Sequence, residues 1–313
     1  MKSDYDAAGI TDPVLRADYE YCRSLAQTHG QTYFLATRLL PADRRPAVHA
    51  LYGFARTADD IVDDLESSTS QRAGSLDGLA RDLRRDRPVH PASRAVVDAV
   101  RRHGIDPDLH DQFLHSMRMD LTVTQYETFA DLEGYMRGSA AAIGMQLLPI
   151  LGTVGPSEAA EPYAAALGVA FQMTNFIRDV GEDLDRGRIY LPQESMRAHG
   201  VTPEHLQELI VDEPVRALLR DEVARTREIY AFAEPGIERL APVARECVRT
   251  AFVLYRDILG EVERHHYRVL DRRVVVPMHR RISVAGPNLA RAVRLRLRRP
   301  RAGDGSTDTT PTA

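Results

Sequence analysis

Cysteine is scarce in this chain of 313 residues, and several other features are missing from it. Its two cysteines, Cys22 and Cys247, offer neither a disulfide framework nor the spacing of a metal site, which fits a reducing cytoplasm. The 11 histidines form no HExxH arrangement, and no GxGxxG segment is present for a nicotinamide cofactor. The formal net charge of −4 gives no overall signature of nucleic-acid binding.

Long hydrophobic runs are also missing. The most apolar stretch, residues 139–154, is short for a membrane span and is interrupted by Gln146, Pro149 and Gly152. Its alanines and glycines suit a core helix that leaves room for a ligand tail, with a plainly packed core helix as the alternative. The first residues lack the apolar segment of a secretory signal peptide. We therefore expect a cytoplasmic protein.

An arginine-rich segment near the end of the chain is the exception to this charge pattern. Residues 291–301 hold six arginines and two leucines. They could contact anionic lipid headgroups at the inner face of the membrane. Arginine and leucine do not separate on a helical wheel, however, which favours a solvated basic tail. The composition of residues 301–313 predicts a disordered end.

Alternating patterns typical of β-strands are nearly absent, so the predicted fold class is all-α, in one domain over residues 1–300. Hydrophobic residues make up 43% of the chain and charged residues 27%, enough for a substantial core. Polar clusters, such as residues 65–77, are predicted to separate the helices. Helical periodicity predicts helices over residues 13–29, 41–64, 92–103, 107–119, 132–151, 161–183, 215–233 and 242–267.

One of these helices, within residues 167–183, is polar on a single narrow stripe. On a helical wheel, Gln172, Asn175, Asp179 and Asp183 fall within an arc of roughly 80°, and most of the remaining surface is apolar. A helix that is apolar on most sides is normally buried. Its carboxylates then need a compensating cation, either an arginine or lysine or a metal ion.

A second segment, residues 50–64, has the same arrangement of polar residues on one face of a predicted helix. Tyr52, Arg56, Asp59 and Asp63 fall within about 60° of one another on the wheel. In both segments two aspartates are spaced i, i+4, which weakens an isolated helix by about 0.2–0.5 kcal/mol. An ordinary solvated acidic face is the alternative for either copy alone. Two copies in one chain favour sites that hold divalent cations.

The type of ligand indicates the type of cation. All the paired groups are oxygen donors, which favours Mg²⁺ or Mn²⁺ over zinc. Arg56 and Arg178 flank the two clusters and could bind phosphate oxygens in a bidentate manner. Carboxylates, magnesium and arginines inside an apolar helical cavity predict a site for a diphosphate with a long hydrocarbon tail.

The sequences RTADDIVDD (56–64) and NFIRDVGEDLDRGRIYLP (175–192) resemble the two signature motifs of the phytoene/squalene synthase family. The similarity continues at residues 29–40 (HGQTYFLATRLL), 135–144 and 255–267, and it is closest to bacterial phytoene synthases. It implies an isoprenoid-synthase helical fold with a central apolar cavity. It also implies a Mg²⁺-dependent prenyltransferase that joins two geranylgeranyl diphosphates head to head, through a cyclopropylcarbinyl diphosphate, to phytoene.

Two alternatives stay open at this point. The chain could condense two C15 farnesyl diphosphates to presqualene diphosphate, squalene or dehydrosqualene. Alternatively, it could be a catalytically inactive scaffold that only binds a prenyl diphosphate. Proton loss to phytoene would need no NADPH. The expected partners are prenyl diphosphates, with peripheral membrane contact or a downstream desaturase as further candidates.

The resemblance also assigns roles to individual residues. It assigns catalysis to the four aspartates with Arg56 and Tyr52, and it leaves open whether Arg272 or Arg273 meets diphosphate. Gly30 departs from the family pattern, where a hydroxyl residue is frequent. The implied metal ligands are Asp59, Asp63, Asn175, Asp179 and Asp183. The implied substrate contacts are His29, Thr32, Tyr52, Arg56, Gln172, Asn175, Arg178 and Tyr255.

Overall fold

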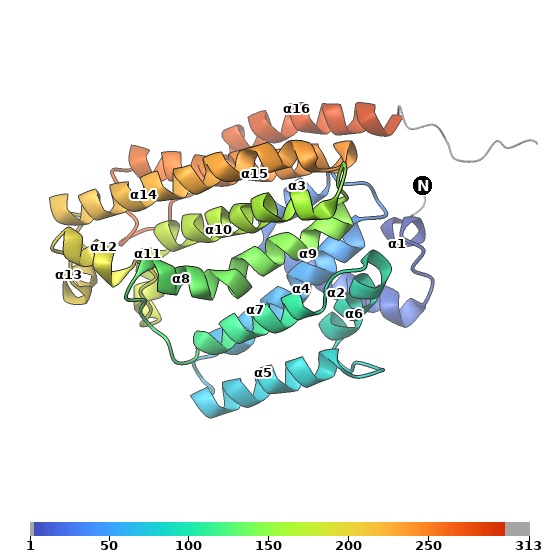
Figure 1. Cartoon of the computed structure of the whole chain (residues 1–313), viewed down its shortest axis with the longest axis horizontal. Coiled ribbons are helices and arrows are strands. Elements are labelled where there is room, and N and C mark those ends of the chain that lie inside the picture. The colour runs from blue at the N-terminus through green and yellow to red at the C-terminus, as the bar shows by residue number, and fades with distance from the viewer. Residues whose placement is uncertain (1–2, 298–313) are drawn as a thin grey trace, which may run out of the picture.

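The computed structural model describes residues 3–297, which form helices joined by short connections (Figure 1). Within these residues no strand forms, and only two isolated bridges pair Gln125 with Ile189 and Thr153 with Leu240. The elements are α1 (Asp4–Ala7), α2 (Pro13–His29), α3 (Gln31–Thr37), α4 (Arg45–Asp63), α5 (Thr69–Leu83), α6 (Pro91–His103), α7 (Asp108–Met119), α8 (Phe129–Met136), the π-helical turn η1 (Arg137–Ala141), α9 (Ala142–Leu151), the 3₁₀ turn η2 (Ser157–Ala159), α10 (Glu161–Arg178), α11 (Val180–Asp185), α12 (Gln193–Ala198), α13 (Pro203–Gln207), α14 (Glu213–Ala233), the 3₁₀ segment η3 (Glu234–Arg239), α15 (Pro242–Arg264) and α16 (Met278–Leu297).

The predicted all-α class is confirmed, and local sequence signals mark several helix ends. Asp12 caps α2 by accepting a hydrogen bond from the backbone of Val14, and Pro13 occupies the first helical position. Gly104 ends α6 in the left-handed conformation, at φ 64°, which glycine adopts without steric cost. These signals explain why α2 and α6 agree closely with their predicted ranges.

Two expectations about the helices were wrong. Residues 65–77, expected to separate two helices, contain more than half of α5, which begins at a capping box between Ser68 and Gln71. The predicted helix 161–183 is interrupted at Asp179, whose backbone (φ −104°, ψ 15°) leaves the helical region. The backbone of residues 291–297, part of the expected basic tail, belongs to α16. The predicted disordered end, 301–313, lies outside the described residues.

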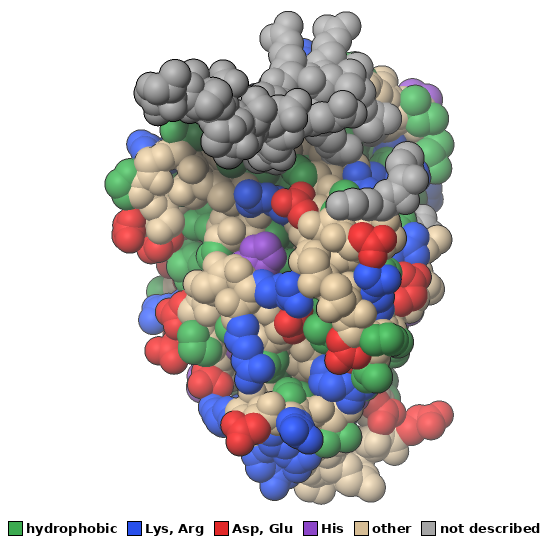
Figure 2. Space-filling model, turned by 90° about the vertical axis from the view of Figure 1, so that its right-hand side faces the viewer, with side chains coloured by type: hydrophobic (Ala, Val, Ile, Leu, Met, Phe, Trp, Pro, Cys, Tyr) green, Lys and Arg blue, Asp and Glu red, His purple; other side chains and the backbone are tan. Residues whose placement is uncertain are grey.

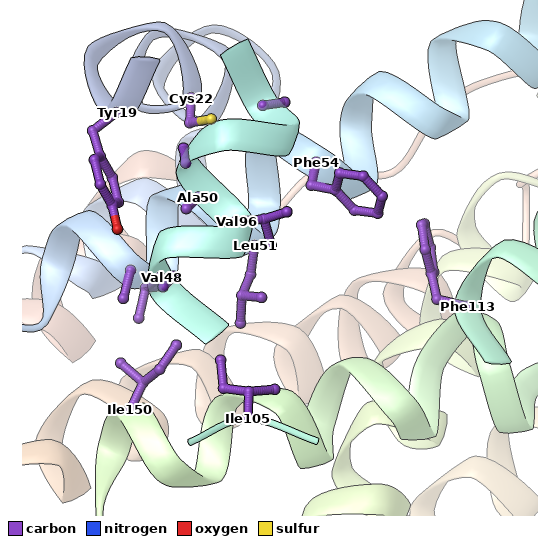
Figure 3. Packing of buried hydrophobic residues seen from close by; sticks show 14 of the residues in the cluster. Tyr19, Cys22, Val48, Ala50, Leu51, Phe54, Val96, Ile105, Phe113 and Ile150 are labelled. Carbon is purple, nitrogen blue, oxygen red and sulfur yellow. The ribbon is translucent and has the colours of Figure 1, made fainter. Parts of the chain in front are cut away.

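The core lies where long helices cross. α10 packs against α14, α9 and α15, and α2 packs against α4 and α6. In the first core cluster, Phe54 of α4 and Phe113 of α7 approach each other with ring centroids 6.2 Å apart (Figure 3). Tyr19 of α2 is buried in the same cluster and donates a hydrogen bond to Asp98 at 2.8 Å. This packing fixes the face of α4 that points away from the acidic residues.

Small residues allow two of these crossings. A Cβ atom at Gly144 would lie 2.2 Å from the carbonyl oxygen of Ala164, and one at Gly168 would lie 2.3 Å from that of Ala140. Both contacts are far closer than a side chain permits, so glycine lets α9 and η1 approach α10. Both glycines also border the apolar cavity described below. A bulky residue at Gly168 would therefore disturb the crossing before it shortened the cavity.

Charge is distributed differently over different parts of the surface. Over the described part of the end of the molecule that carries α1 and α6, acidic and basic side chains are interspersed (Figure 2). None of the helices between residues 3 and 297 combines the length and the apolar character needed to cross a bilayer.

Candidate active site

A cavity of about 680 Å³ lies between the end of α2, α4, η1, α10, α15 and the segment before α16. A second, apolar cavity of about 160 Å³ adjoins it, and Tyr33 and Ile143 line both. The larger cavity carries the polar side chains, whereas the smaller one is lined almost entirely by aliphatic and aromatic residues. Together they form a polar chamber with an apolar extension, an arrangement that suits an amphipathic ligand.

The first acidic cluster enters this chamber from α4. The opposite face of α4 is buried in the core, which leaves Tyr52, Arg56 and Asp59 to line the chamber. Arg56 donates to Asp59 at 3.1 Å and also lies 2.5 Å from Asp60. Asp63, one turn beyond Asp59, is held by Arg188 at 2.9 Å. Burial, followed by the nearby charge of Asp63, raises the pKa of Asp59 to about 6.

The second cluster enters from the end of α10. Arg178 donates to Asp179 at 2.7 Å, and Arg273 lies 3.2 Å from the same carboxylate. The buried Oδ1 atom of Asn175, one turn earlier, has no hydrogen-bond partner among the described residues. Burial, followed by Asp179, raises the pKa of Asp183 to about 8. An unpartnered amide oxygen beside buried carboxylates is a donor set that suits a hard cation.

Most of the predicted site residues meet in the chamber, but not all. Asp63 and Asp183 do not line it, and both lie close to Arg188 instead. The backbone of Thr32 belongs to α3, but its side chain lies outside what the structure describes. The predicted residues that line the chamber are His29, Tyr52, Arg56, Asp59, Gln172, Asn175, Arg178, Asp179 and Tyr255.

The two late arginines lie in different surroundings. Arg273 lines the chamber and contacts Asp179, whereas Arg272 lies 3.6 Å from Asp271 and is not part of the lining. At Gly30, a Cβ atom would lie 2.8 Å from the ring of Tyr52. Glycine at this position therefore lets the tyrosine lie close against the chain at the chamber wall.

The carboxylates do not form a complete metal site by themselves. Between residues 3 and 297, no three side chains of histidine, cysteine, aspartate or glutamate gather closely enough to hold an ion. Each aspartate pair can therefore supply only part of a coordination shell. Mg²⁺ commonly takes one or two carboxylates and completes its shell with water and substrate phosphate, so this arrangement fits a metal that binds together with a diphosphate.

Comparison with known proteins agrees with this geometry. The family model for squalene/phytoene synthase matches residues 26–280. A phytoene synthase from Arthrospira platensis is 36% identical over 280 residues, which cover 85% of this chain and 90% of the relative. A 15-cis-phytoene synthase from Synechococcus elongatus is 34% identical over 279 residues, covering 84% and 90% of the two chains.

The chain belongs to the squalene/phytoene synthase family. Among solved structures, a dehydrosqualene synthase matches with a TM-score of 0.81 and 28% identity, covering 88% of this chain and 96% of that one. A squalene synthase from Alicyclobacillus acidocaldarius matches with a TM-score of 0.75 and 25% identity, covering 83% and 98%. The isoprenoid-synthase fold inferred from the two motifs is therefore confirmed.

Four residues near the family's two motifs were missed by the sequence analysis. Asp120, at the end of α7, accepts hydrogen bonds from Tyr135 at 2.7 Å and from Tyr190 at 2.9 Å. Burial raises the pKa of Asp120 to about 6. Arg188 connects this group to Asp63. Arg188 and Tyr190 lie within the quoted motif 175–192, so a closer inspection of that motif would have found them, but no local pattern marks Asp120.

The raised aspartate pKa values predict how stability depends on pH. Asp59 and Asp183 bind protons more tightly in the folded chain than in the unfolded chain, where the ordinary pKa is 3.8. Stability therefore falls as the pH rises from about 4 through the folded pKa values. Without metal, we expect the thermal midpoint to decrease as the pH is raised from about 5 to about 8. Added Mg²⁺ should raise it more at the upper pH, because metals bind ionised carboxylates.

Scanning calorimetry in EDTA and in Mg²⁺ measures both effects. The Asp183→Asn variant is the matched comparison, since it removes the group with the higher pKa and should flatten the upper part of the pH dependence. A midpoint that rises with pH in wild-type protein without metal would contradict the prediction.

Proposed function

We propose that this chain condenses two geranylgeranyl diphosphates head to head to phytoene, through a cyclopropylcarbinyl diphosphate, with release of diphosphate. The observation that carries the proposal is the joined pair of cavities: arginines and aspartates face the polar chamber, and apolar side chains line its extension. The names of the relatives from Arthrospira platensis and Synechococcus elongatus support phytoene as the product.

Divalent metal is part of this proposal. Mg²⁺, with Mn²⁺ as an alternative, would be held in the chamber by Asp59 from one side and by Asn175 and Asp179 from the other. Asp63 and Asp183, the further ligands that the family resemblance implies, lie outside the chamber lining. When bound, it neutralises diphosphate charge as the allylic C–O bond breaks. Burial, and then the charge of a neighbouring carboxylate, raises the pKa values of Asp59 and Asp183. This supports the assignment, because a bound cation would stabilise the ionised form against both effects.

The arginines of the chamber would bind the diphosphate oxygens. Arg56, Arg178 and Arg273 are now paired with carboxylates that face the same chamber. A metal at those carboxylates would compete for them and leave guanidinium groups free for diphosphate. Fixed donors of this kind stabilise the negative charge that develops on the leaving group, so they lower the barrier to ionisation.

Aromatic side chains would protect the allylic cation. Tyr33 and Tyr52 stack with ring centroids 5.3 Å apart, and Phe171 and Tyr255 stack at 4.4 Å. All four line one or both cavities. Their faces can stabilise a cation, and their bulk excludes water that would otherwise trap it. The second substrate's double bond would then be the nucleophile that remains available.

A product assay tests the proposal directly. Purified protein is supplied with geranylgeranyl diphosphate, farnesyl diphosphate or both, with and without NADPH, and the hydrocarbons are identified by mass. We expect a C40 product from the C20 substrate without NADPH, because proton loss ends the reaction.

The C30 reaction is the competing function, and the likeness to the dehydrosqualene synthase structure favours it. If both substrates yield only C30 product, or if hydrocarbon release requires NADPH, the phytoene assignment is wrong. If prenyl diphosphates bind without any turnover, the chain is a binding scaffold.

Contact with a membrane or with a desaturase is also part of the proposed function. The product is a hydrocarbon with almost no solubility in water, so it must leave the cavity for an apolar environment. The region suggested from the sequence, residues 291–301, is described only as far as residue 297.

A further inference from the structure

Large apolar side chains are exposed at the mouth of the polar chamber. Val275 lines the chamber and is 60% exposed, so the chamber reaches the surface there. Met278 and Ile282, at the start of α16, are 63% and 62% exposed. Three such residues within eight positions form an apolar patch, which we call the mouth patch: Val275, Met278 and Ile282.

The outward position of this patch follows from how α16 packs. α16 lies on α15, and it buries Val284 and Asn288 there, with Asn288 donating to Thr250 at 2.7 Å. Ile282 is two residues from Val284, which places the two side chains about 200° apart around the helix. Met278 is one turn before Ile282 on the same outward side. The patch therefore faces away from the protein core.

Basic side chains surround the mouth patch. Residues 268–282 contain five arginines and one aspartate, a formal charge of +4 for the segment, although the whole chain carries −4. Arg280 pairs with Asp257 and Arg268 with Asp271, which compensate part of this charge. Arg272 and Arg273 have half-exposed side chains, and Arg281 lines the chamber. The charges at the other end of the molecule are interspersed (Figure 2). An apolar patch within a basic rim is complementary to a bilayer with anionic headgroups.

We propose that the mouth patch docks the enzyme onto an anionic phospholipid bilayer, so that the chamber opens at the lipid surface. This proposal rests on the proposed function, since only an oily substrate and product need such a route. The apolar side chains would enter the headgroup region, and the arginines would contact lipid phosphates. A second copy of this chain fits the surface less well, because the same basic segment would face itself across such an interface.

Vesicle flotation tests the proposal with the full-length protein. Vesicles of phosphatidylglycerol and vesicles of phosphatidylcholine serve as the anionic and neutral surfaces. We expect wild-type protein to float with the anionic vesicles and to be released as salt is raised. The double variant Met278→Glu, Ile282→Glu should bind at least ~10-fold more weakly. The matched control, Val14→Glu with Val89→Glu, places the same charge on apolar residues that are 61% and 64% exposed, and it should bind like wild type.

Each outcome bears on the proposal. Equal binding of the double variant and the wild type, or equal binding to both vesicle types, would overturn it. So would a wild-type dimer that the double variant converts to a monomer in analytical ultracentrifugation, because the patch would then be a protein interface. Turnover in detergent, with the product mass recorded, separates the docking proposal from the phytoene proposal. The double variant should keep wild-type turnover in detergent. A C30 product would contradict the phytoene assignment without affecting the vesicle result.

Discussion

Excess EDTA should reduce turnover to background, and Mg²⁺ or Mn²⁺ should restore it. The proposed ligands are all oxygens, which bind these hard cations in preference to softer metals. Arg56, Arg178 and Arg273 of the chamber are paired with aspartates, so without a metal much of their charge is already compensated. The diphosphate would then lack the charge neutralisation that its departure requires.

The control for this experiment is a measurement of helix content without and with metal. Far-ultraviolet circular dichroism in EDTA should match that of the protein in Mg²⁺, because the helices are held by apolar packing in which the proposed ligands take no part. Full turnover in EDTA would show that arginine side chains alone supply the electrostatic stabilisation.

The two acidic motifs illustrate how much of the site is visible in the sequence. Asp59 and Asp63 share a helical face, as do Asn175 and Asp179, so helical spacing alone brought each pair together. The side chains of Asp59 and Asp179 do line one chamber. Their meeting depends on contacts between residues more than a hundred positions apart, which periodicity does not encode. The family resemblance supplied that information.

The break at Asp179 illustrates what spacing misses. The segment 167–183 has a continuous helical pattern, yet the backbone leaves the helix at Asp179. A Cβ atom at Gly181 would lie 2.2 Å from the carbonyl oxygen of Leu270, so the start of α11 packs directly against a distant segment. This tertiary contact, which a local pattern cannot predict, accompanies the reorientation of Asp183 away from the chamber lining.

Helix α5 was missed for a different reason. Only Leu76, Leu79, Ala80 and Asp82 are buried in it, and Gly74 and Gly78 lower its intrinsic helical propensity. Its apolar stripe is therefore narrow, and its glycines look like those of a connection. The capping box at Ser68 was the available signal, since a serine followed three residues later by glutamine is typical of a helix start.

Replacing Asp59 or Asp179 by asparagine should each lower kcat at least ~10²-fold, which corresponds to about 2.7 kcal/mol of lost transition-state stabilisation. Asparagine keeps the shape and one oxygen of aspartate but removes the charge that a divalent cation requires. Both side chains line the chamber from different helices. The two variants therefore test the two halves of the site separately, with turnover measured at saturating substrate and Mg²⁺.

Asp77→Asn is the matched control, since it makes the same chemical change on an exposed aspartate that does not line the chamber. Asp77 lies in α5 and pairs with Arg118, and an exposed pair of this kind contributes little to stability. Its turnover should equal that of wild type. The thermal midpoint of Asp59→Asn should not fall, because the variant removes a charge that burial disfavours and relieves repulsion from Asp63. That of Asp179→Asn should fall modestly, because Arg178 and Arg273 lose their carboxylate partner. Similar losses of turnover in all three variants would mean that the chamber aspartates have no special role in the reaction.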